Sequence, residues 1–217
     1  MAVKARRRYD SPRRAEQARQ ARAAVTEAAR RLFLRDGFAA TTVAAVAAEA
    51  RVSVETIYKA FGGKPGLVRA ICDAELAGGE RRTRLPLTEP DPRTVIRGWG
   101  NLSADNAPRV APFLLLAREA AATDPAMAAL RAELDADRLE RMTRNAAHLA
   151  DAGHLRPGIT VAHAAEVMWV YTSPELYEML VLGRGWPPSR YGAFIADAVI
   201  AALLPPQPPS HPARQHP

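Results

Sequence analysis

The chain has 217 residues, 48% of them hydrophobic, with a formal net charge of +7. This length allows one or two domains with a core, and the abundance of alanine favours helices. A single cysteine, Cys72, excludes an internal disulfide, which fits a reducing cytoplasm. No stretch approaches the roughly 18 uninterrupted apolar residues of a membrane span, and no apolar stretch follows the basic N-terminus as in a secretory signal. We therefore expect a cytoplasmic protein without membrane contact.

The positive charge is concentrated in the first part of the chain. Residues 1–80 hold 15 Lys and Arg against 9 Asp and Glu, so +6 of the +7 lies there. The density is highest in residues 1–14, where six basic side chains oppose only Asp10. A basic, flexible arm of this kind fits a phosphate or minor-groove contact with DNA. It equally fits a solvated tail, and the sequence leaves both interpretations open.

The first predicted helix begins at Ser11-Pro12 and runs to about Asp36. Serine is a favoured N-cap, and proline is tolerated at the first helical position. Gly37 follows the predicted end of this helix. We expect it to adopt the left-handed conformation that commonly terminates helices.

Two short helices are predicted next, separated by a tight turn at 51–53. Either Thr41 or Thr42 supplies an N-cap hydroxyl for the first, and Ser53 supplies one for the second. An apolar stripe at helical spacing marks the first short helix, formed by Val43, Val46, Ala47 and Ala50. Ile57 and Phe61 can pack on it, which leaves the front of the second helix free for a major groove. The pattern predicts a helix-turn-helix from Thr42 to Phe61 and DNA as the partner.

This segment closely resembles the TetR (tetracycline-repressor-like) family of transcriptional regulators. The resemblance rests on Leu32-Phe33, Gly37-Phe38, Thr41-Thr42-Val43, Val46-Ala47, Ala50, Val52-Ser53, Thr56-Ile57-Tyr58, Phe61, Lys64 and Leu67. It implies an all-α fold with an N-terminal three-helix DNA-binding domain. A C-terminal helical domain for ligand binding and dimerisation would follow.

The predicted domains divide the chain into four parts. The basic arm of 1–14 precedes a DNA-binding domain of 15–80, in which a fourth helix runs from Lys64 to about Ala77. Three prolines within 86–92 cannot continue a regular helix, so we place a hinge there. A helical domain of 91–204 follows. From residue 205 onward, 6 of 13 residues are proline, which predicts a disordered tail over 205–217.

Caps and breakers divide the second domain into helices. These are predicted over 94–106, 109–123, 125–152, 161–172, 175–182 and 189–204. Asp124, Thr160, Ser173 and Ser189 are the expected N-caps. The family resemblance implies that 161–172 and 189–204 form a homodimer interface. Because two-fold dimers match two-fold operators, the implied target is an inverted repeat in double-stranded DNA.

The expected DNA contacts divide into phosphate and base contacts. By resemblance, phosphates are contacted by Thr42, Thr56, Tyr58 and Lys64, which hold the register without reading sequence. Val54, Glu55 and Lys59 occupy the exposed front of the recognition helix and are expected to meet thymine methyl, cytosine N4 and guanine edges. Val43 and Ala44 complete the set, although alanine cannot hydrogen-bond where some relatives place a polar residue.

Two positions depart from the family pattern. Arg51 stands where relatives usually have glycine, and a left-handed arginine there costs about 1 kcal/mol. The turn is either kept with this strain or rebuilt, and Arg51 is either exposed or a further phosphate contact. Ala60 replaces a commonly larger polar residue and is expected to remove one backbone contact.

The resemblance also implies an effector pocket in the second domain. Candidate lining residues are Trp99, Phe113, Met142, Trp169 and Tyr177, each of which could equally be ordinary core. The three histidines of this domain lack a helix-face metal spacing, and Cys72 has no resolving partner. No phosphate loop, nucleophile elbow or zinc pattern is present. We therefore expect no enzyme activity, no metal and no cofactor.

The sequence thus favours a homodimeric repressor that leaves an inverted-repeat operator when a small-molecule effector binds. An activator or a ligand-independent regulator fits the same residues. A non-specific DNA-binding protein would show steep salt dependence without operator preference. A helical enzyme or ligand-binding module that has lost DNA binding is disfavoured by the intact Thr56, Tyr58 and Lys64.

Overall fold

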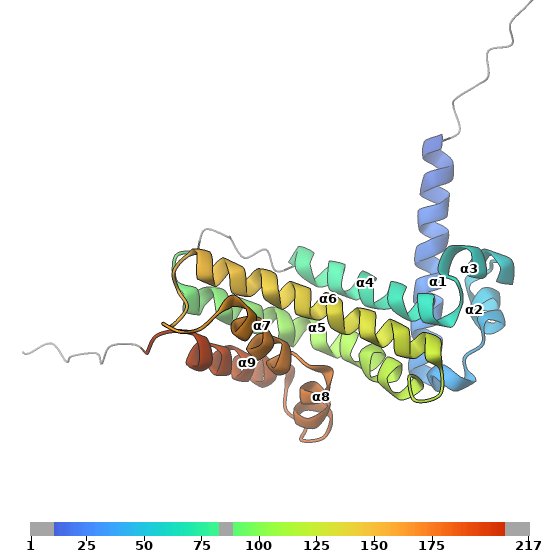
Figure 1. Ribbon diagram of the computed structural model, residues 1–217. Coiled ribbons are helices and arrows are strands. Elements are labelled where there is room, and N and C mark those ends of the chain that lie inside the picture. Colours follow the sequence, from blue (N-terminus) through green and yellow to red (C-terminus); the bar gives the residue numbers. More distant parts are fainter. Residues whose placement is uncertain (1–10, 83–88, 207–217) are drawn as a thin grey trace, which may run out of the picture. The chain divides into compact units, whose positions relative to one another are not determined.

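The computed structural model describes residues 11–82 and 89–206, which contain helices and no strand (Figure 1). These residues fall into two compact units. The first unit consists of Met1–Gly78 with Arg109–Leu134, and the second of Gly79–Pro108 with Asp135–Pro217. The predicted all-α class is confirmed. The units cut across the predicted domain ranges, because 109–134 groups with the N-terminal helices; those functional ranges stay a prediction.

Four helices open the chain: α1 (Ser11–Ala40), α2 (Val43–Ala50), α3 (Val54–Phe61) and α4 (Lys64–Arg82). Regular geometry in α1 is interrupted at Gly37, near the predicted end at Asp36. Gly37 has the expected positive φ of 77°, but its ψ of 176° is extended rather than left-handed helical. Only glycine adopts this combination readily, so the position still requires glycine.

The core of the first unit lies between these helices and parts of two longer ones. Val25, Ala28, Ala29, Leu32 and Phe33 of α1 form one side of it. The other buried residues are Val43, Val46 and Ala47 of α2, Ile57 of α3, Leu67, Val68, Ile71 and Cys72 of α4, and Phe113, Ala117, Met127, Leu130 and Leu134. Short helices such as α2 and α3 are marginal alone. Their apolar backs against this core therefore hold them in place.

α4 extends further than the sequence predicts. It continues through Gly78-Gly79 to Arg82 rather than ending near Ala77. A glycine inside a helix costs about 1 kcal/mol but does not break it. The expected hinge at 86–92 falls largely on residues 83–88, outside the described residues. So do residues 1–10 of the basic arm and 207–217 of the tail.

α5 (Pro92–Ala120) is a single helix, and the prediction of two helices over 94–106 and 109–123 is wrong. Asp91 caps its start by accepting from the backbone N–H groups of Arg93 and Thr94, both at 3.1 Å. Pro108 and Pro112 each remove one helical hydrogen bond. The burial of Val110, Ala111, Phe113 and Leu115 beside them offsets that loss.

The remaining elements are α6 (Pro125–Asp151), α7 (Val161–Tyr171), α8 (Pro174–Tyr177), the π-helical η1 (Glu178–Leu182) and α9 (Pro188–Leu203). Asp124, Thr160 and Ser173 are N-caps as predicted. The predicted helix 175–182 is instead an α-helical turn followed by a π turn. α9 begins at Pro188, so Ser189 is not its cap.

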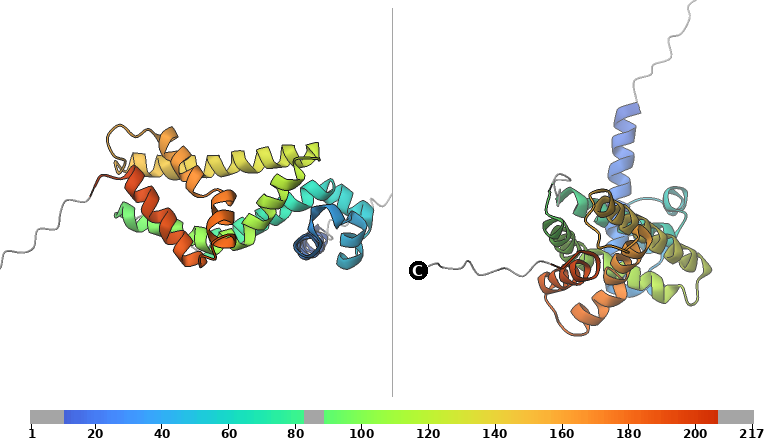
Figure 2. Two further views of the ribbon diagram at one scale, coloured as in Figure 1. Left: turned by 90° about the horizontal axis from the view of Figure 1, so that it is seen from below. Right: turned by 60° about the vertical axis from the view of Figure 1, so that its left-hand side comes forward.

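The second unit has its own apolar packing, in which α7 lies against α9 (Figure 2). α7 contributes Ala164, Ala165 and Met168, and α9 contributes Tyr191, Ile195, Ala196, Val199 and Leu203. Tyr177 meets Tyr191 edge to face with ring centroids 5.5 Å apart. Burial raises the pKa of both phenols, so both hydroxyls are neutral at physiological pH.

Candidate nucleic-acid interface

The first part of the interface is the start of α2. Thr42 is the N-cap, and its hydroxyl accepts from the Ala45 N–H at 3.1 Å. Thr41 is instead buried and donates to the Gly37 carbonyl at 2.7 Å. Of the two threonines left open by the sequence, Thr42 is therefore the cap. Capping fixes the Thr42 side chain at the exposed end of α2, where free N–H groups also favour an anion.

The turn between α2 and α3 keeps the left-handed conformation despite its arginine. Arg51 has φ 56° and ψ 43°, and its N–H donates to the Ala48 carbonyl at 3.2 Å. The Val52 N–H donates to Ala47 at 3.0 Å. The turn is therefore not rebuilt. The Arg51 side chain is exposed, and whether it contacts phosphate stays open.

α3 buries one face and exposes the other. Ser53 caps it by accepting from the Thr56 N–H at 3.1 Å, and the Ser53 and Thr56 hydroxyls lie 2.8 Å apart. Ile57 is completely buried, whereas Val54 is 39% and Tyr58 55% exposed. Glu55 and Lys59 are exposed as well. Val54 and Tyr58 are large side chains exposed to solvent on one short helix. Their exposure indicates that this face of α3 contacts a partner.

Six of the predicted contact residues line one hollow of about 580 Å³ between α2, α3 and the start of α4. They are Thr42, Val43, Ala44, Val54, Tyr58 and Lys64. Glu55, Thr56 and Lys59 lie on α3 outside it. The Val43 side chain is only 9% exposed and packs into the core, so any contact of Val43 with DNA would come from its backbone.

Lys64 has a structural role that the sequence does not reveal. Its ammonium donates to the Phe38 carbonyl and lies 4.0 Å from the centroid of the Phe38 ring. Partial burial lowers the pKa of Lys64, and the Asp124 carboxylate opposes that shift. Lys64 thus ties the end of α1 to the start of α4. A phosphate contact by the same ammonium would have to share it with the Phe38 carbonyl.

The end of α3 is held by a residue that sequence reasoning missed. The Arg22 guanidinium, from α1, donates to the Ala60 carbonyl at 2.9 Å and lies 4.4 Å from the Phe61 ring centroid. Gly66 is the second missed residue: a Cβ there would lie 1.7 Å from the Phe61 carbonyl oxygen. The sequence signal for Arg22 was its position three residues before Val25, the first buried residue of α1.

The predicted effector residues do not gather in one place. Phe113 belongs to the core of the first unit. In the second unit, Trp99 and Met142 are half-buried, and the Thr172 hydroxyl lies 3.8 Å from the Met142 sulfur. Tyr177 packs on Tyr191. These residues stay candidates for an effector site, with Phe113 placed apart from the others.

Trp169 is engaged by a buried arginine. The Arg138 guanidinium lies 4.3 Å from the Trp169 ring centroid and donates to the Trp169 carbonyl and, at 3.2 Å, to Asp135. Burial lowers the pKa of Arg138, and Asp135 opposes that shift. The sequence carried a signal, because Arg138 interrupts an apolar stripe of α6 between Leu134 and Met142.

Comparisons with known proteins agree with this geometry. Residues 25–71 match the model of the family described as "Bacterial regulatory proteins, tetR family". No curated protein matches the chain. Among solved structures, a putative TetR-family transcriptional regulator from Rhodococcus sp. has a TM-score of 0.70 at 16% identity, covering 85% of this chain and 99% of its own.

Two further similar structures are named for small molecules. The SmeT–triclosan complex has a TM-score of 0.64 at 21% identity, covering 88% of this chain and all of its own. SmeT is described as the repressor of a Stenotrophomonas maltophilia multidrug efflux pump. The flavonoid-responsive regulator FrrA has a TM-score of 0.61 at 22% identity, covering 86% of this chain and 98% of its own.

An all-helical chain with a capped helix-turn-helix and an exposed recognition helix is a DNA-binding transcriptional regulator. The match to the family model covers residues 25–71, which contain the helix-turn-helix, and the similar solved structures share the fold of the longer chain. This family consists of regulators rather than enzymes. Within the described ranges 11–82 and 89–206, no helix combines the length and apolar character needed to cross a membrane.

Proposed function

We propose that the chain is a homodimeric repressor that binds an inverted-repeat operator and releases it when a small molecule binds. The observation that carries the DNA-binding part is the single hollow that Thr42, Val54, Tyr58 and Lys64 line together. The hydroxyls of Thr42 and Tyr58 and the ammonium of Lys64, which are the proposed phosphate contacts, border the exposed front of α3 there. Such an arrangement supports the proposed phosphate contacts beside the proposed base contacts, as groove recognition requires.

A homodimer is supported by apolar side chains left exposed on the second unit. We call these the unit 2 apolar face: Val170, Met179 and Leu182, which are 56%, 59% and 59% exposed, and Phe194, which is 37% exposed. Phe194 lies edge-on between Tyr171 and Trp186, with ring centroids 6.2 and 5.7 Å away. The face lies on α7, η1 and α9, and two of these helices carry the predicted dimer interface. Large apolar side chains left exposed on helices that contact one another favour a protein partner.

The effector is a small molecule that prefers the dimer geometry unable to bind two successive major grooves. SmeT and FrrA, which share the fold, are described with triclosan and flavonoids respectively. To shift the equilibrium from mostly bound to mostly released, the effector must prefer the second state by about 5.5 kcal/mol. Trp99, Trp169 and Trp186 lie in the second unit, so effector binding there should change tryptophan fluorescence.

The experiment selects duplexes from a random DNA pool with the full chain. An inverted repeat should emerge, and sedimentation should show one dimer on each selected duplex. Tyr58→Phe removes one exposed hydroxyl and should weaken binding about tenfold, since a hydrogen bond to a charged group contributes roughly 1.5 kcal/mol. Tyr191→Phe, the same change at a tyrosine buried inside the second unit, should leave affinity unchanged. Enrichment of no common sequence would refute the operator and favour a non-specific DNA-binding protein.

Repression is tested separately with a reporter behind the selected inverted repeat. Expression of the chain should lower reporter output, and Tyr58→Phe should relieve this effect. Higher output with the intact chain would instead identify an activator, which the same interface would serve. Small molecules that restore output without changing reporter expression in the absence of the chain are candidate effectors. Their binding is then measured directly by tryptophan fluorescence.

A further inference from the structure

The two ends of α3 are held by different kinds of contact. At its start the Ser53 hydroxyl, a neighbour in the sequence, accepts from the Thr56 N–H at 3.1 Å. At its end the Ala60 carbonyl accepts from the Arg22 guanidinium at 2.9 Å. Arg22 belongs to α1, which lies beside α3 in the same unit (Figure 1). Because the last carbonyls of a helix lack a partner within the helix, the end of α3 depends on this contact with another helix.

Core packing alone does not fix the angle of α3. Of its eight residues only Ile57 is buried, and Phe61 packs on the core at the helix end. One buried side chain near the middle of a short helix fixes its position but allows its ends to tilt about that point. Ala60 lies three residues beyond Ile57, about 4.5 Å at 1.5 Å per residue. The contacts at the two ends therefore decide the angle at which α3 lies on the core.

Arg22 also holds the end of α3 through Phe61. Its guanidinium lies 4.4 Å from the centroid of the Phe61 ring, a cation–π contact that adds to the hydrogen bond. α1 anchors Arg22, because the helix enters the core one turn later at Val25, which is 1% exposed. The start of α4 lies against Phe61 as well, since a Cβ on Gly66 would be 1.7 Å from the Phe61 carbonyl oxygen. The end of α3 is thus held by both α1 and α4.

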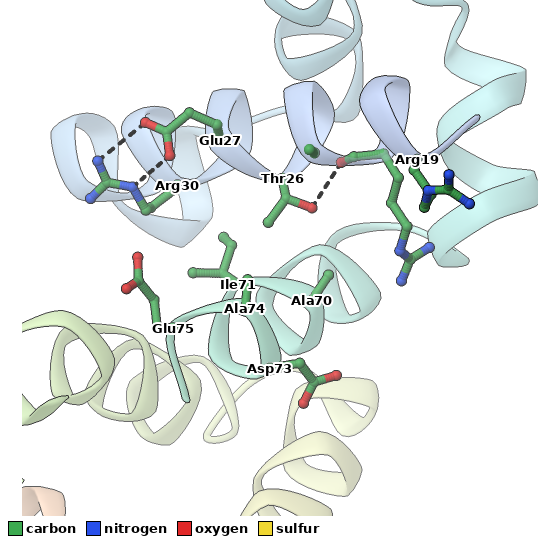
Figure 3. A pocket seen from close by; sticks show the side chains of 11 residues that line it. Arg19, Thr26, Glu27, Arg30, Ala70, Ile71, Asp73, Ala74 and Glu75 are labelled. Atoms are coloured by element: carbon green, nitrogen blue, oxygen red, sulfur yellow. Dashed lines mark hydrogen bonds and ion pairs between the residues drawn. The ribbon is translucent and has the colours of Figure 1, made fainter. Parts of the chain in front are cut away.

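The hollow between α1 and α4 does not compete for Arg22. Arg22 lines this hollow of about 520 Å³, and Asp73 and Glu75 line it from α4 (Figure 3). Asp73 is paired with Arg69 at 3.0 Å, and Glu75 with Arg109 at 3.1 Å. Both carboxylates therefore already have cationic partners, and the Arg22 guanidinium contacts α3 instead.

We propose that Arg22 is a positioning residue for sequence recognition, which sets the angle of α3 in the major groove without contacting DNA itself. The proposal rests on the proposed function, in which α3 reads base edges. Base contacts are hydrogen bonds with strict distances and angles. Phosphate contacts are largely electrostatic and carry no sequence information. A tilt of α3 therefore lowers affinity for the preferred sequence and spares non-specific binding.

The effect of Arg22 differs along α3. The Ser53 cap holds the start of the helix, where Val54 lies, whatever residue replaces Arg22. Lys59 directly precedes Ala60, so release of the Ala60 carbonyl moves Lys59 more than Val54. Recognition of base pairs by Lys59 should therefore depend on Arg22 more strongly than recognition by Val54.

The test compares two affinities of the full chain: for the duplex that it selects from a random pool, and for a random-sequence duplex of the same length. Arg22→Gln should lower their ratio about tenfold, comparable to the loss of one base contact. The salt slope on the random duplex should stay at the wild-type value, since no phosphate contact is lost. A smaller folded fraction lowers both affinities alike, so a merely structural role leaves the ratio unchanged. Arg22→Lys should restore part of the ratio, because an ammonium can still donate to the Ala60 carbonyl.

Arg30→Gln is the matched control. Arg30 also lies on α1 and lines the same hollow, but its partner is Glu27 on its own helix, at 2.9 Å. Its variant should keep the wild-type ratio and slope. An unchanged ratio in Arg22→Gln would overturn the proposal, and so would a slope lower by about 1, which would make Arg22 a phosphate contact. A wild-type chain that prefers no sequence would instead refute the proposed function, and this inference with it.

Single base-pair substitutions in the selected duplex give a second test. Lys59→Gln identifies the base pairs that depend on Lys59, and Val54→Ala identifies those that depend on Val54. Arg22→Gln should weaken the preference at the first set and keep it at the second. Equal weakening at both sets would mean that Arg22 supports α3 as a whole, which contradicts a role at its C-terminal end. The comparison requires no inverted repeat, so it is independent of the proposed symmetry of the operator.

Discussion

The backbones of α5 and α9 meet at Gly100 and Gly192 so closely that neither residue has room for a side chain. A Cβ on Gly100 would lie 2.4 Å from the Gly192 carbonyl oxygen, and a Cβ on Gly192 equally close to the Gly100 carbonyl oxygen. The neighbouring contacts are also small, from Ala196 and Ala104. The second unit therefore depends on two glycines that face each other across this crossing.

Gly100→Ala should destabilise the second unit by at least about 2 kcal/mol, because the helices must separate to admit the methyl group. Chemical unfolding followed by circular dichroism measures the loss. Asn101→Ala is the control, since Asn101 is the adjacent, exposed residue of the same helix. It should be neutral or slightly stabilising by helix propensity. If the two variants unfold at the same denaturant concentration, the close crossing does not exist in solution.

Arg51→Gly should stabilise the first unit by up to about 1 kcal/mol, since glycine accepts φ 56° without a Cβ penalty. The greater freedom of glycine in the unfolded chain reduces this gain. Arg51→Ala separates strain from side-chain contacts, because alanine keeps the Cβ and loses only the guanidinium. It should not stabilise. Stabilisation by both variants alike would show that the arginine side chain, rather than the turn, is unfavourable.

The same pair of variants decides the role of Arg51 toward DNA. The side chain is exposed on the turn beside α3. If it contacts a phosphate, Arg51→Gly and Arg51→Ala should both lower the salt slope of DNA binding by about 1. If it is only exposed, both slopes stay at the wild-type value. We expect the wild-type slope, since no contact fixes this guanidinium toward the recognition face.

Local chemistry in the sequence was sufficient for the helix-turn-helix. Thr42 and Ser53 are caps because their hydroxyls compete for free N–H groups within three residues, and such contacts depend on sequence neighbours alone. The same local rules failed at Pro108 and Pro112, where α5 continues. There the deciding interaction is burial against distant segments, which propensity does not contain. The prediction that α4 ends before Gly78-Gly79 was wrong for a related reason. Glycine lowers the stability of a helix but does not by itself end it.

The sequence predicted which side chains of the site are exposed, because exposure follows from their spacing along a helix. It did not predict the roles of side chains that contact residues far away in the sequence. Exposure of Val54 and Tyr58 follows from their spacing relative to Ile57. The engagement of Lys64 by Phe38, 26 residues away, and of Arg22 by Ala60, 38 residues away, does not. Arg138 was predictable in part. Its position within an apolar stripe indicates that the side chain is buried, but not that it packs on Trp169.

Leu182→Glu should weaken the proposed homodimer through the unit 2 apolar face. Leu182 is 59% exposed there, and a carboxylate in a dimer interface would face apolar surface and its symmetry mate. Sedimentation equilibrium should show a dissociation constant raised about tenfold or more, equivalent to about 1.4 kcal/mol. Leu139→Glu makes the same change at a 39% exposed leucine on α6. It should leave dimerisation unchanged, and parallel weakening by both would argue against this face as the interface.

Asp91→Asn should flatten the acid limb of the stability profile. Hydrogen bonds from the Thr94 hydroxyl and then the Arg93 N–H lower the pKa of Asp91 below 3.8. Between that lowered pKa and 3.8 the unfolded chain binds more protons than the folded chain, so stability falls as pH falls. The contribution of Asp91 is therefore complete above about pH 4 and lost below its folded pKa. Asparagine also caps helices well, so the variant should match the wild type near neutrality.

The measurement is urea unfolding at pH values from about 3 to about 6. Below about pH 4 the wild-type chain should lose stability more steeply than Asp91→Asn as the pH falls. Above that pH the two stability curves should coincide. Asp105→Asn removes the same charge from an exposed position in the middle of α5. Because Asp105 is far from the helix start, its variant should follow the wild-type curve. If Asp91→Asn lost stability at acid pH as steeply as the wild-type chain, the cap of α5 would not depend on the Asp91 carboxylate.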